Sequence, residues 1–154
     1  MNKLLPFLLV VFLSIFPLSL EAQVALQPEP SQPLMKKEVK RFLKHYINLY
    51  MKMDFDGFMA LFSKGAVENR MYPYGFIYEG YRNNFEVSKS FQYKLTIWSM
   101  KTHDQGAFVT GRYVISQTFR KWGKKKVYKG DIHFDLVRES GSLKIRELNY
   151  GMSR

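Results

Sequence analysis

Three side chains of this sequence could transfer protons. Glu68 lies just before an aromatic region, and His133 and Asp135 are two residues apart in a segment that alternates polar and apolar residues. A buried carboxyl group has a raised pKa and can act as an acid or a base, whereas a solvated Glu68 would be an ordinary strand glutamate. His133 and Asp135 share one face of a strand with Asp131, so they can serve chemistry only if that face lines a cavity.

Metal ions and cofactors have no recognisable site in the sequence. The histidines, His45, His103 and His133, are isolated from one another, and the chain contains no cysteine. Zinc sites need histidines or thiolates at short spacings, and neither a glycine-rich phosphate loop nor a Gly-x-Ser-x-Gly elbow occurs. We therefore expect no cofactor, no metal and no disulfide.

A cluster of cations surrounds Trp122. The pair Trp122-Gly123 is a turn signal between alternating segments, so the cluster is expected at a hairpin tip. Lysines can extend to anionic head groups while an indole ring lies at the boundary; alternatively, the turn is solvated and Trp122 folds back on the sheet. The candidate anion-binding residues are Arg120, Lys121, Trp122, Lys124, Lys125 and Lys126.

Helices are predicted in the first half of the chain, where apolar residues recur every three or four positions. An amphipathic helix is predicted over 39–51, with a cationic outer face. Asp54 or Asp56 would cap a short second helix that extends to Phe62, and a third helix would cover 76–87. The inward stripe of the first helix contains Val39, Phe42, Leu43, Tyr46, Ile47, Tyr50 and Met51.

Strands are predicted in the second half, because beyond Ser90 the hydrophobic period changes to two. Helices followed by an antiparallel meander predict an α+β domain with its helices on one face of the sheet. A short extended piece at 66–70 precedes the third helix. The alternating segments are 91–97, 109–115, 131–136 and 143–150, separated by turn residues at 103–106, 122–123 and 140–141.

The N-terminus indicates export. Residues 1–22 have the pattern of a signal peptide, with Lys3 before a long apolar run and a small residue at the cleavage point; a membrane anchor is the alternative. We expect residues 23–34 to form a proline-rich tether and residues 35–154 a single domain. The formal net charge of +11 favours anionic surfaces, while export argues against nucleic acid as a partner.

Several motifs resemble the nuclear transport factor 2-like superfamily, which includes SnoaL-like proteins, ketosteroid isomerase and scytalone dehydratase. The resemblance covers 39–150 and implies a cystatin-like α+β cone, with N-terminal helices packed in the concave face of a strongly curved antiparallel or mixed sheet. Packing motifs of this kind indicate fold rather than activity. The motifs are the long helix that ends at Asp54, DFDGFMALFSKGAVEN at 54–69, IYEGYRNNF at 77–85 and GDIHFDLVRESGSLKI at 130–145.

The resemblance also implies where a catalytic base would lie. Ketosteroid isomerase carries its base as the aspartate of a Val-Glu-Asp motif, and here Val-Glu-Asn occupies that place at 67–69. Asn69 can donate and accept hydrogen bonds but cannot take a proton, so isomerase chemistry of that type loses its base. Asp135 would correspond to the family's strand acid, and Tyr46 or Tyr50 to its oxyanion tyrosine, although core packing also explains both tyrosines.

We therefore expect an exported binding domain rather than an enzyme, with a small apolar or aromatic ligand or a protein partner. One alternative is a small lyase or isomerase in which a carboxylate or histidine of the cone cavity works with a tyrosine. Another is a scaffold that forms a homodimer through its sheet face, or that binds an anionic surface or membrane. The candidate ligand-binding residues are Tyr46, Tyr50, Asn69 and Tyr113.

Overall fold

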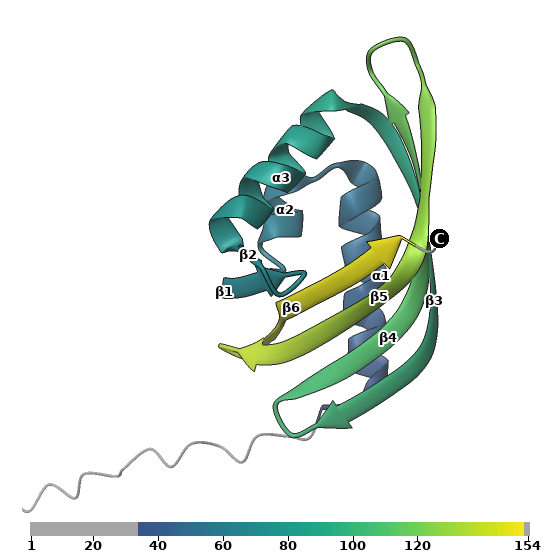
Figure 1. The fold of residues 1–154 in the computed structure, drawn as a ribbon. Coiled ribbons are helices and arrows are strands. Elements are labelled where there is room, and N and C mark those ends of the chain that lie inside the picture. The colour runs from purple at the N-terminus through teal and green to yellow at the C-terminus, as the bar shows by residue number, and fades with distance from the viewer. Residues whose placement is uncertain (1–33, 153–154) are drawn as a thin grey trace, which may run out of the picture.

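The computed structural model describes residues 34–152, which fold into three helices and one six-stranded sheet (Figure 1). The predicted signal peptide and nearly all of the predicted tether lie outside the described residues. Within residues 34–152, no helix is both long and apolar enough to cross a bilayer. The elements are α1 (Lys36–Lys52), α2 (Phe55–Met59), β1 (Phe62–Glu68), β2 (Tyr72–Pro73), α3 (Tyr74–Val87), β3 (Ser88–His103), β4 (Gly106–Phe119), β5 (Lys125–Glu139) and β6 (Ser142–Met152).

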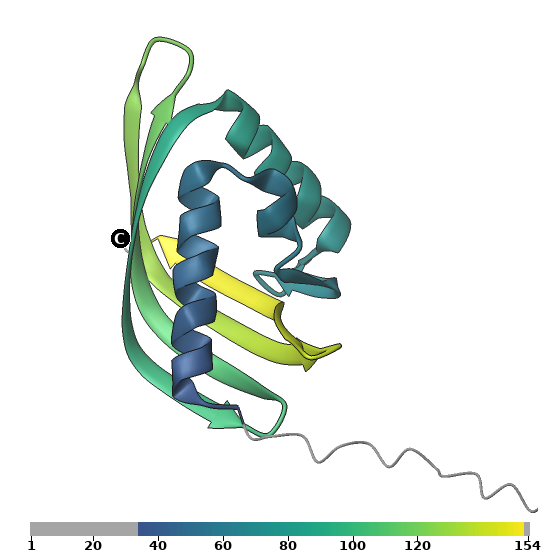
Figure 2. The same cartoon turned by 180° about the vertical axis from the view of Figure 1, so that it is seen from behind.

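The sheet is mixed, with the strand order β2-β1-β6-β5-β4-β3. Strands β3 to β6 form the predicted antiparallel meander, and β1 runs parallel to β6. All three helices lie on the same side of this sheet (Figures 1 and 2). The α+β fold class is therefore confirmed, and β3 is the edge strand beside α1.

α1 buries the predicted stripe with two differences. Val39, Tyr46 and Tyr50 are almost fully buried, as the spacing requires. Leu49 is also buried, whereas Met51 is 38% exposed, so its predicted place in the core was wrong. Leu49 follows Tyr46 by three residues and continues the stripe, while Met51 lies at the edge of the stripe.

The segment after α2 pairs with a distant strand. Asp54 caps α2 by accepting a hydrogen bond from the Gly57 amide (3.0 Å), as predicted. The helix ends at Met59, and Phe62 begins β1 instead of ending the helix, because it pairs with Ile145 of β6. The predicted extended piece at 66–70 consequently starts earlier, at Phe62, and ends at Glu68.

The sheet bends along its long strands but is not strongly curled (Figures 1 and 2), so the predicted curvature was too large. β-bulges are the features that bend paired strands. The β4–β5 pair runs in unbroken register from Gly106 to Thr118, and the β5–β6 pair shifts register only between Asp135 and Leu136. The β3–β4 pair shifts register twice, between Ser88 and Ser90 and between Ile97 and Ser99. The bend is therefore moderate, with irregularities on both sides of an unbroken β4–β5 ladder.

Candidate functional site

A cavity of about 250 Å³ lies between α1, α3 and the helix-covered face of the sheet. Seven of its lining residues are tyrosines, so we call it the tyrosine cavity. Pockets of this kind, with apolar walls and a few polar groups, are the usual form of a small-molecule site. The lining residues are Tyr46, Tyr50, Tyr81, Asn84, Tyr93, Tyr113, Ile115, Gln117, Tyr128, Ile132 and Tyr150.

Local periodicity brings these side chains to the cavity. Tyr46 and Tyr50 are four residues apart on α1 and therefore share a face. On β4, the inward positions alternate, so Tyr113 and Gln117 lie on the same side of the sheet. The sequence identified Tyr46, Tyr50 and Tyr113 as candidates, and the structure brings all three into one cavity, where β3, β5 and β6 contribute the other strand tyrosines.

The tyrosine side chains form aromatic walls with neutral hydroxyl groups. The Tyr50 and Tyr93 rings meet edge to face with centroids 5.3 Å apart, and the Tyr46 and Tyr93 rings do so at 5.8 Å. Burial raises the pKa of Tyr46, Tyr50 and Tyr93 above its ordinary value. These phenols are therefore un-ionised at neutral pH and can each donate and accept hydrogen bonds.

A buried polar chain reaches the cavity from α3 and β4. The Gln117 side-chain amide, which is 2% exposed, donates to Asn84 Oδ1 (2.8 Å) and to Ser88 Oγ (2.7 Å). The Asn84 amide donates to the Tyr50 hydroxyl (3.2 Å). This chain orients the Tyr50 hydroxyl. The sequence analysis did not identify Gln117, although it continues the inward alternation of Tyr113 and Ile115.

Glu68 lies in a side hollow of about 240 Å³ that shares Tyr81, Asn84 and Tyr150 with the tyrosine cavity. The carboxyl group is at the end of β1 on a residue that is 8% exposed. The Tyr81 hydroxyl donates a hydrogen bond to Glu68 Oε1 (2.9 Å). Burial raises the pKa of Glu68, and interactions with the Tyr81 and Tyr150 hydroxyls oppose part of this rise.

Asn69 has a structural contact at the end of β1. Its backbone is in the left-handed region (φ 50°), and its Oδ1 accepts a hydrogen bond from the Tyr150 amide (2.8 Å). The backbone N–H of Asn69 donates a hydrogen bond to the Leu148 carbonyl (2.9 Å). Asn69 therefore ties β1 to β6 and lies outside the lining of the tyrosine cavity.

His133 and Asp135 lie on the outer face of the sheet, where Asp131 is also exposed, because the residues between them are buried. Asp135 is ion-paired with Arg146 (2.8 Å), and His133 Nδ1 is 3.2 Å from Thr110 Oγ1. The structure does not bring these residues together with Glu68. Among residues 34–152, no three histidine, aspartate or glutamate side chains gather where they could hold a metal ion.

The outer face of the sheet also carries exposed aromatic side chains. Trp98 is 53% exposed and Phe108 51% exposed. Arg112 stacks on the Trp98 ring (5.5 Å to the centroid) and is ion-paired with Asp131 (3.0 Å). Homodimerisation through this face stays a prediction.

The β4–β5 hairpin projects beyond the rest of the sheet (Figures 1 and 2). Trp122 and Gly123, at its tip, both have positive φ, which suits a tight hairpin turn. The Trp122 side chain is 85% exposed, and Lys121 Nζ is 4.3 Å from the centre of its ring. Of the candidate cations, Lys121 contacts the exposed indole ring at the tip. Arg120 instead donates a hydrogen bond to the Glu86 carbonyl (2.9 Å), and Lys126 Nζ lies 4.7 Å from the centre of the Tyr128 ring, which lines the tyrosine cavity.

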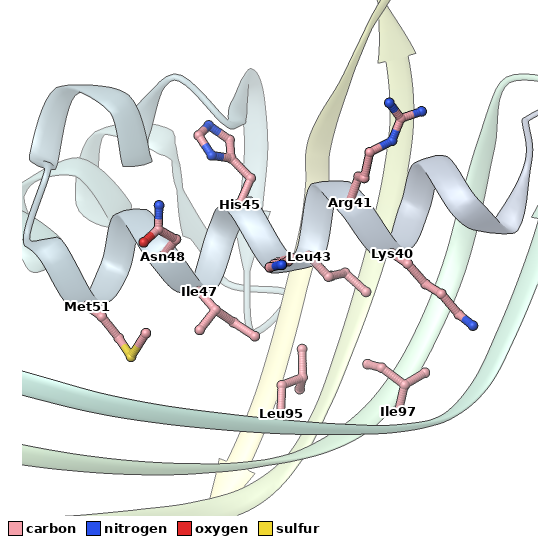
Figure 3. Close-up of a pocket in the computed structure, with 10 residues that line it drawn as sticks. Lys40, Arg41, Leu43, His45, Ile47, Asn48, Met51, Leu95 and Ile97 are labelled. Carbon is pink, nitrogen blue, oxygen red and sulfur yellow. The ribbon is translucent and has the colours of Figure 1, made fainter.

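A second concavity, of about 680 Å³, lies between α1 and the edge strand β3, and we call it the basic groove (Figure 3). Apolar side chains of both elements face each other across it, and exposed cations of α1 border it. The sequence analysis did not identify this groove. The lining residues are Lys40, Arg41, Leu43, Lys44, His45, Ile47, Asn48, Met51, Leu95 and Ile97.

Comparisons with known proteins support the fold. No sequence family and no curated protein matches the chain. A nuclear transport factor 2-like superfamily protein from Salmonella enterica is 15% identical, with a TM-score of 0.66 over 77% of this chain and 90% of that one. ActVI-ORFA from Streptomyces coelicolor is 15% identical, with a TM-score of 0.62 over 77% and 94%.

A conserved protein from Planctomyces limnophilus has the same architecture. It is 13% identical to this chain, with a TM-score of 0.67 over 73% of this chain and 91% of its own. Likeness at this level of identity is a likeness of fold, and activity must be argued from the site itself.

Proposed function

We propose that the tyrosine cavity of this chain, which has the nuclear transport factor 2-like fold, binds a small aromatic ligand without transforming it. The observation that carries this proposal is the convergence of seven tyrosines from α1, α3 and four strands on one cavity. Aromatic walls favour a flat apolar body through edge-to-face and stacking contacts. Neutral phenols and side-chain amides favour a ligand with one uncharged polar group.

The size of the cavity limits the ligand. A volume of about 250 Å³ lies just below the range of roughly 300–1,000 Å³ that is typical of sites for drug-sized molecules. We therefore expect a ligand of one or two rings. Its polar group would meet the Tyr50 hydroxyl, which Asn84 and Gln117 hold in place.

Saturation-transfer NMR with a panel of one-ring and two-ring aromatic alcohols, amides and ketones tests this proposal. Ile115→Trp should fill the cavity that Ile115 lines and remove the transfer to bound fragments. Val114→Trp is the matched control, because Val114 is the preceding residue of β4 and is exposed on the other face. Thermal unfolding should show that both variants are folded. Equal fragment binding by the two variants would refute the proposed site.

A second candidate function is proton transfer by Glu68. The specific observation that favours it is a buried carboxyl group with a raised pKa beside a tyrosine hydroxyl at 2.9 Å. A carboxyl group whose pKa moves towards neutrality is better suited to act as a general acid or base near neutral pH. A ligand that reached the side hollow would place its acidic C–H or its leaving group beside Glu68.

Deuterium exchange distinguishes this candidate from binding alone. Small aromatic and alicyclic ketones would be incubated with the protein in D₂O, and loss of their α-proton signals would be followed by NMR. Catalysis predicts exchange that Glu68→Gln abolishes and Glu79→Gln leaves unchanged, because Glu79 is exposed on α3. Fragment binding with no exchange above the buffer rate would leave the binding function and exclude Glu68 as a base for these compounds.

A further inference from the structure

The basic groove combines an apolar floor with a cationic border. Leu43, Ile47 and Met51 recur every four residues and therefore form one row on α1. Leu95 and Ile97 of β3 face this row across the groove (Figure 3). Exposure increases along the row, from 4% at Leu43 to 38% at Met51. The row thus leaves apolar surface open to solvent at one end.

The charges around the groove all have one sign. Lys40, Arg41 and Lys44 line it and are exposed, and no carboxylate is among its lining residues. None of the ion pairs found among the described residues involves these three cations. Glu38, the only acidic residue of α1, is paired with Arg138 (2.9 Å). An anionic group is therefore the complementary partner.

The arrangement of cations and apolar residues suits an elongated ligand. In Figure 3, the Lys40 side chain points to the end of the groove where Ile97 lies, and Met51 is at the opposite end. The helix between Lys40 and Met51 is about 16 Å long at 1.5 Å per residue. An extended alkyl chain of a dodecanoate-sized molecule has a comparable length.

Ten residues line the groove, about half or fewer of the roughly 20–30 residues that a stable protein interface takes from each partner. The groove by itself therefore suits a small ligand better than a protein partner. We infer that the basic groove binds a free single-chain anionic amphiphile, with its acidic head at Lys40 and Lys44 and its alkyl chain between α1 and β3. This inference is independent of the tyrosine cavity, because the two sets of lining residues do not overlap.

Methyl NMR and calorimetry of the domain with dodecanoate, below its micelle-forming concentration, test the inference. The methyl signals of Leu43, Ile47, Met51, Leu95 and Ile97 should shift together. Dodecyltrimethylammonium, which has the same chain length and the opposite charge, should bind at least about tenfold more weakly.

Charge reversal on one helix provides the matched controls. Lys40→Glu combined with Lys44→Glu should weaken dodecanoate binding about tenfold, because two complementary charges become repulsive. Lys36→Glu combined with Lys37→Glu makes the same change in net charge on α1 outside the groove and should leave the affinity unchanged. Ile47→Gln should also weaken binding, and thermal unfolding should show that each variant is folded.

Three results would overturn the inference. The first is no calorimetric binding of dodecanoate; if the Lys40→Glu and Lys44→Glu double variant then also loses binding to anionic vesicles, the groove is a bilayer contact. The second is methyl shifts confined to residues of the tyrosine cavity. The third is an equal effect of the two charge-reversal pairs, which would indicate unspecific attraction.

Discussion

The Glu68 carboxyl group is buried at the end of β1, and this burial raises its pKa. The folded state therefore holds the proton more tightly than the unfolded chain does. The protonated Glu68 carboxyl group therefore contributes to the free energy of unfolding. This contribution is fully present below the pKa that Glu68 has in the unfolded chain, and it is lost as the pH rises through the pKa of Glu68 in the folded protein. The effect belongs to this one residue and can be separated from the rest of the chain by substitution.

We expect the free energy of unfolding of Glu68→Gln to fall less than that of the native chain as the pH rises from about 4 to about 8. Urea unfolding at each pH measures the difference. Glu79→Gln, on the exposed side of α3, should follow the native curve. A Glu68→Gln curve parallel to the native one would show that Glu68 titrates alike in the folded and unfolded states.

Tyr81 is predicted to stabilise the Glu68 carboxylate through their hydrogen bond. Tyr81→Phe should cost about 1–3 kcal/mol at neutral pH, because a buried carboxylate loses its donor. The cost should be smaller when position 68 carries glutamine, which is neutral. A double-mutant cycle measures this coupling, and an identical cost in both backgrounds would mean that the two side chains do not interact.

The sequence was sufficient to identify some of these residues one by one, but not to predict which of them lie together in the cavity. Glu68 was a candidate from its residue type, and Tyr46 and Tyr50 were candidates through the resemblance; these two tyrosines and the candidate Tyr113 line the tyrosine cavity. Tyr150 was outside the candidate set because its partners come from strand register, which distant pairings determine. The outer position of His133 follows from its alternation with buried residues, but which face would line the cavity required the packing of α1.

Elements that depend on local patterns were predicted well. The amphipathic stripe of α1 and the turns at 103–106, 122–123 and 140–141 follow from spacing and turn chemistry. The start of β1 was not predictable locally. Phe62 continues the apolar pattern of α2 in the sequence, but it belongs to β1 because it pairs with Ile145, which is far along the chain. The basic groove was missed for the same reason, since it exists only where α1 lies beside β3.

The β4–β5 hairpin tip is proposed to contact anionic membranes, because Trp122 is 85% exposed among lysines. Trp122→Ala combined with Lys124→Glu should weaken binding to anionic vesicles about tenfold, since each lost basic charge near the surface removes about 1 kcal/mol. Co-sedimentation with anionic and neutral vesicles measures this.

Trp98→Ala is the control for the hairpin, because Trp98 lies on the outer sheet face. It should bind anionic vesicles as the native chain does. Equal binding of the native chain to both kinds of vesicle, or equal binding by the double variant, would contradict the proposed contact.

For the whole molecule, the order of helices and strands predicted an α+β fold, and the resemblance of the motifs at 54–69, 77–85 and 130–145 implied the nuclear transport factor 2-like type. The three structures described share that fold with this chain at 15% identity or less. The moderate bend of the sheet was not predictable, because bulge positions depend on strand pairing.

We propose that the protein is exported, because residues 1–22 have the pattern of a signal peptide. We expect the mature protein to begin at Gln23 and to be released from the cell envelope without detergent. Intact-mass measurement of protein purified from its native host, or from a host with a comparable secretion system, gives the N-terminus directly. A mass that includes Met1, found in the membrane fraction, would favour the alternative of an uncleaved anchor.

A crystal structure of the protein soaked with the tightest-binding aromatic fragment would decide whether the tyrosine cavity is the ligand-binding site. We predict density for the ring between Tyr50, Tyr93 and Tyr113, with the polar group of the fragment at the Tyr50 hydroxyl. A fragment bound only elsewhere, with this cavity closed by its own side chains, would show that the tyrosine cavity is not the binding site.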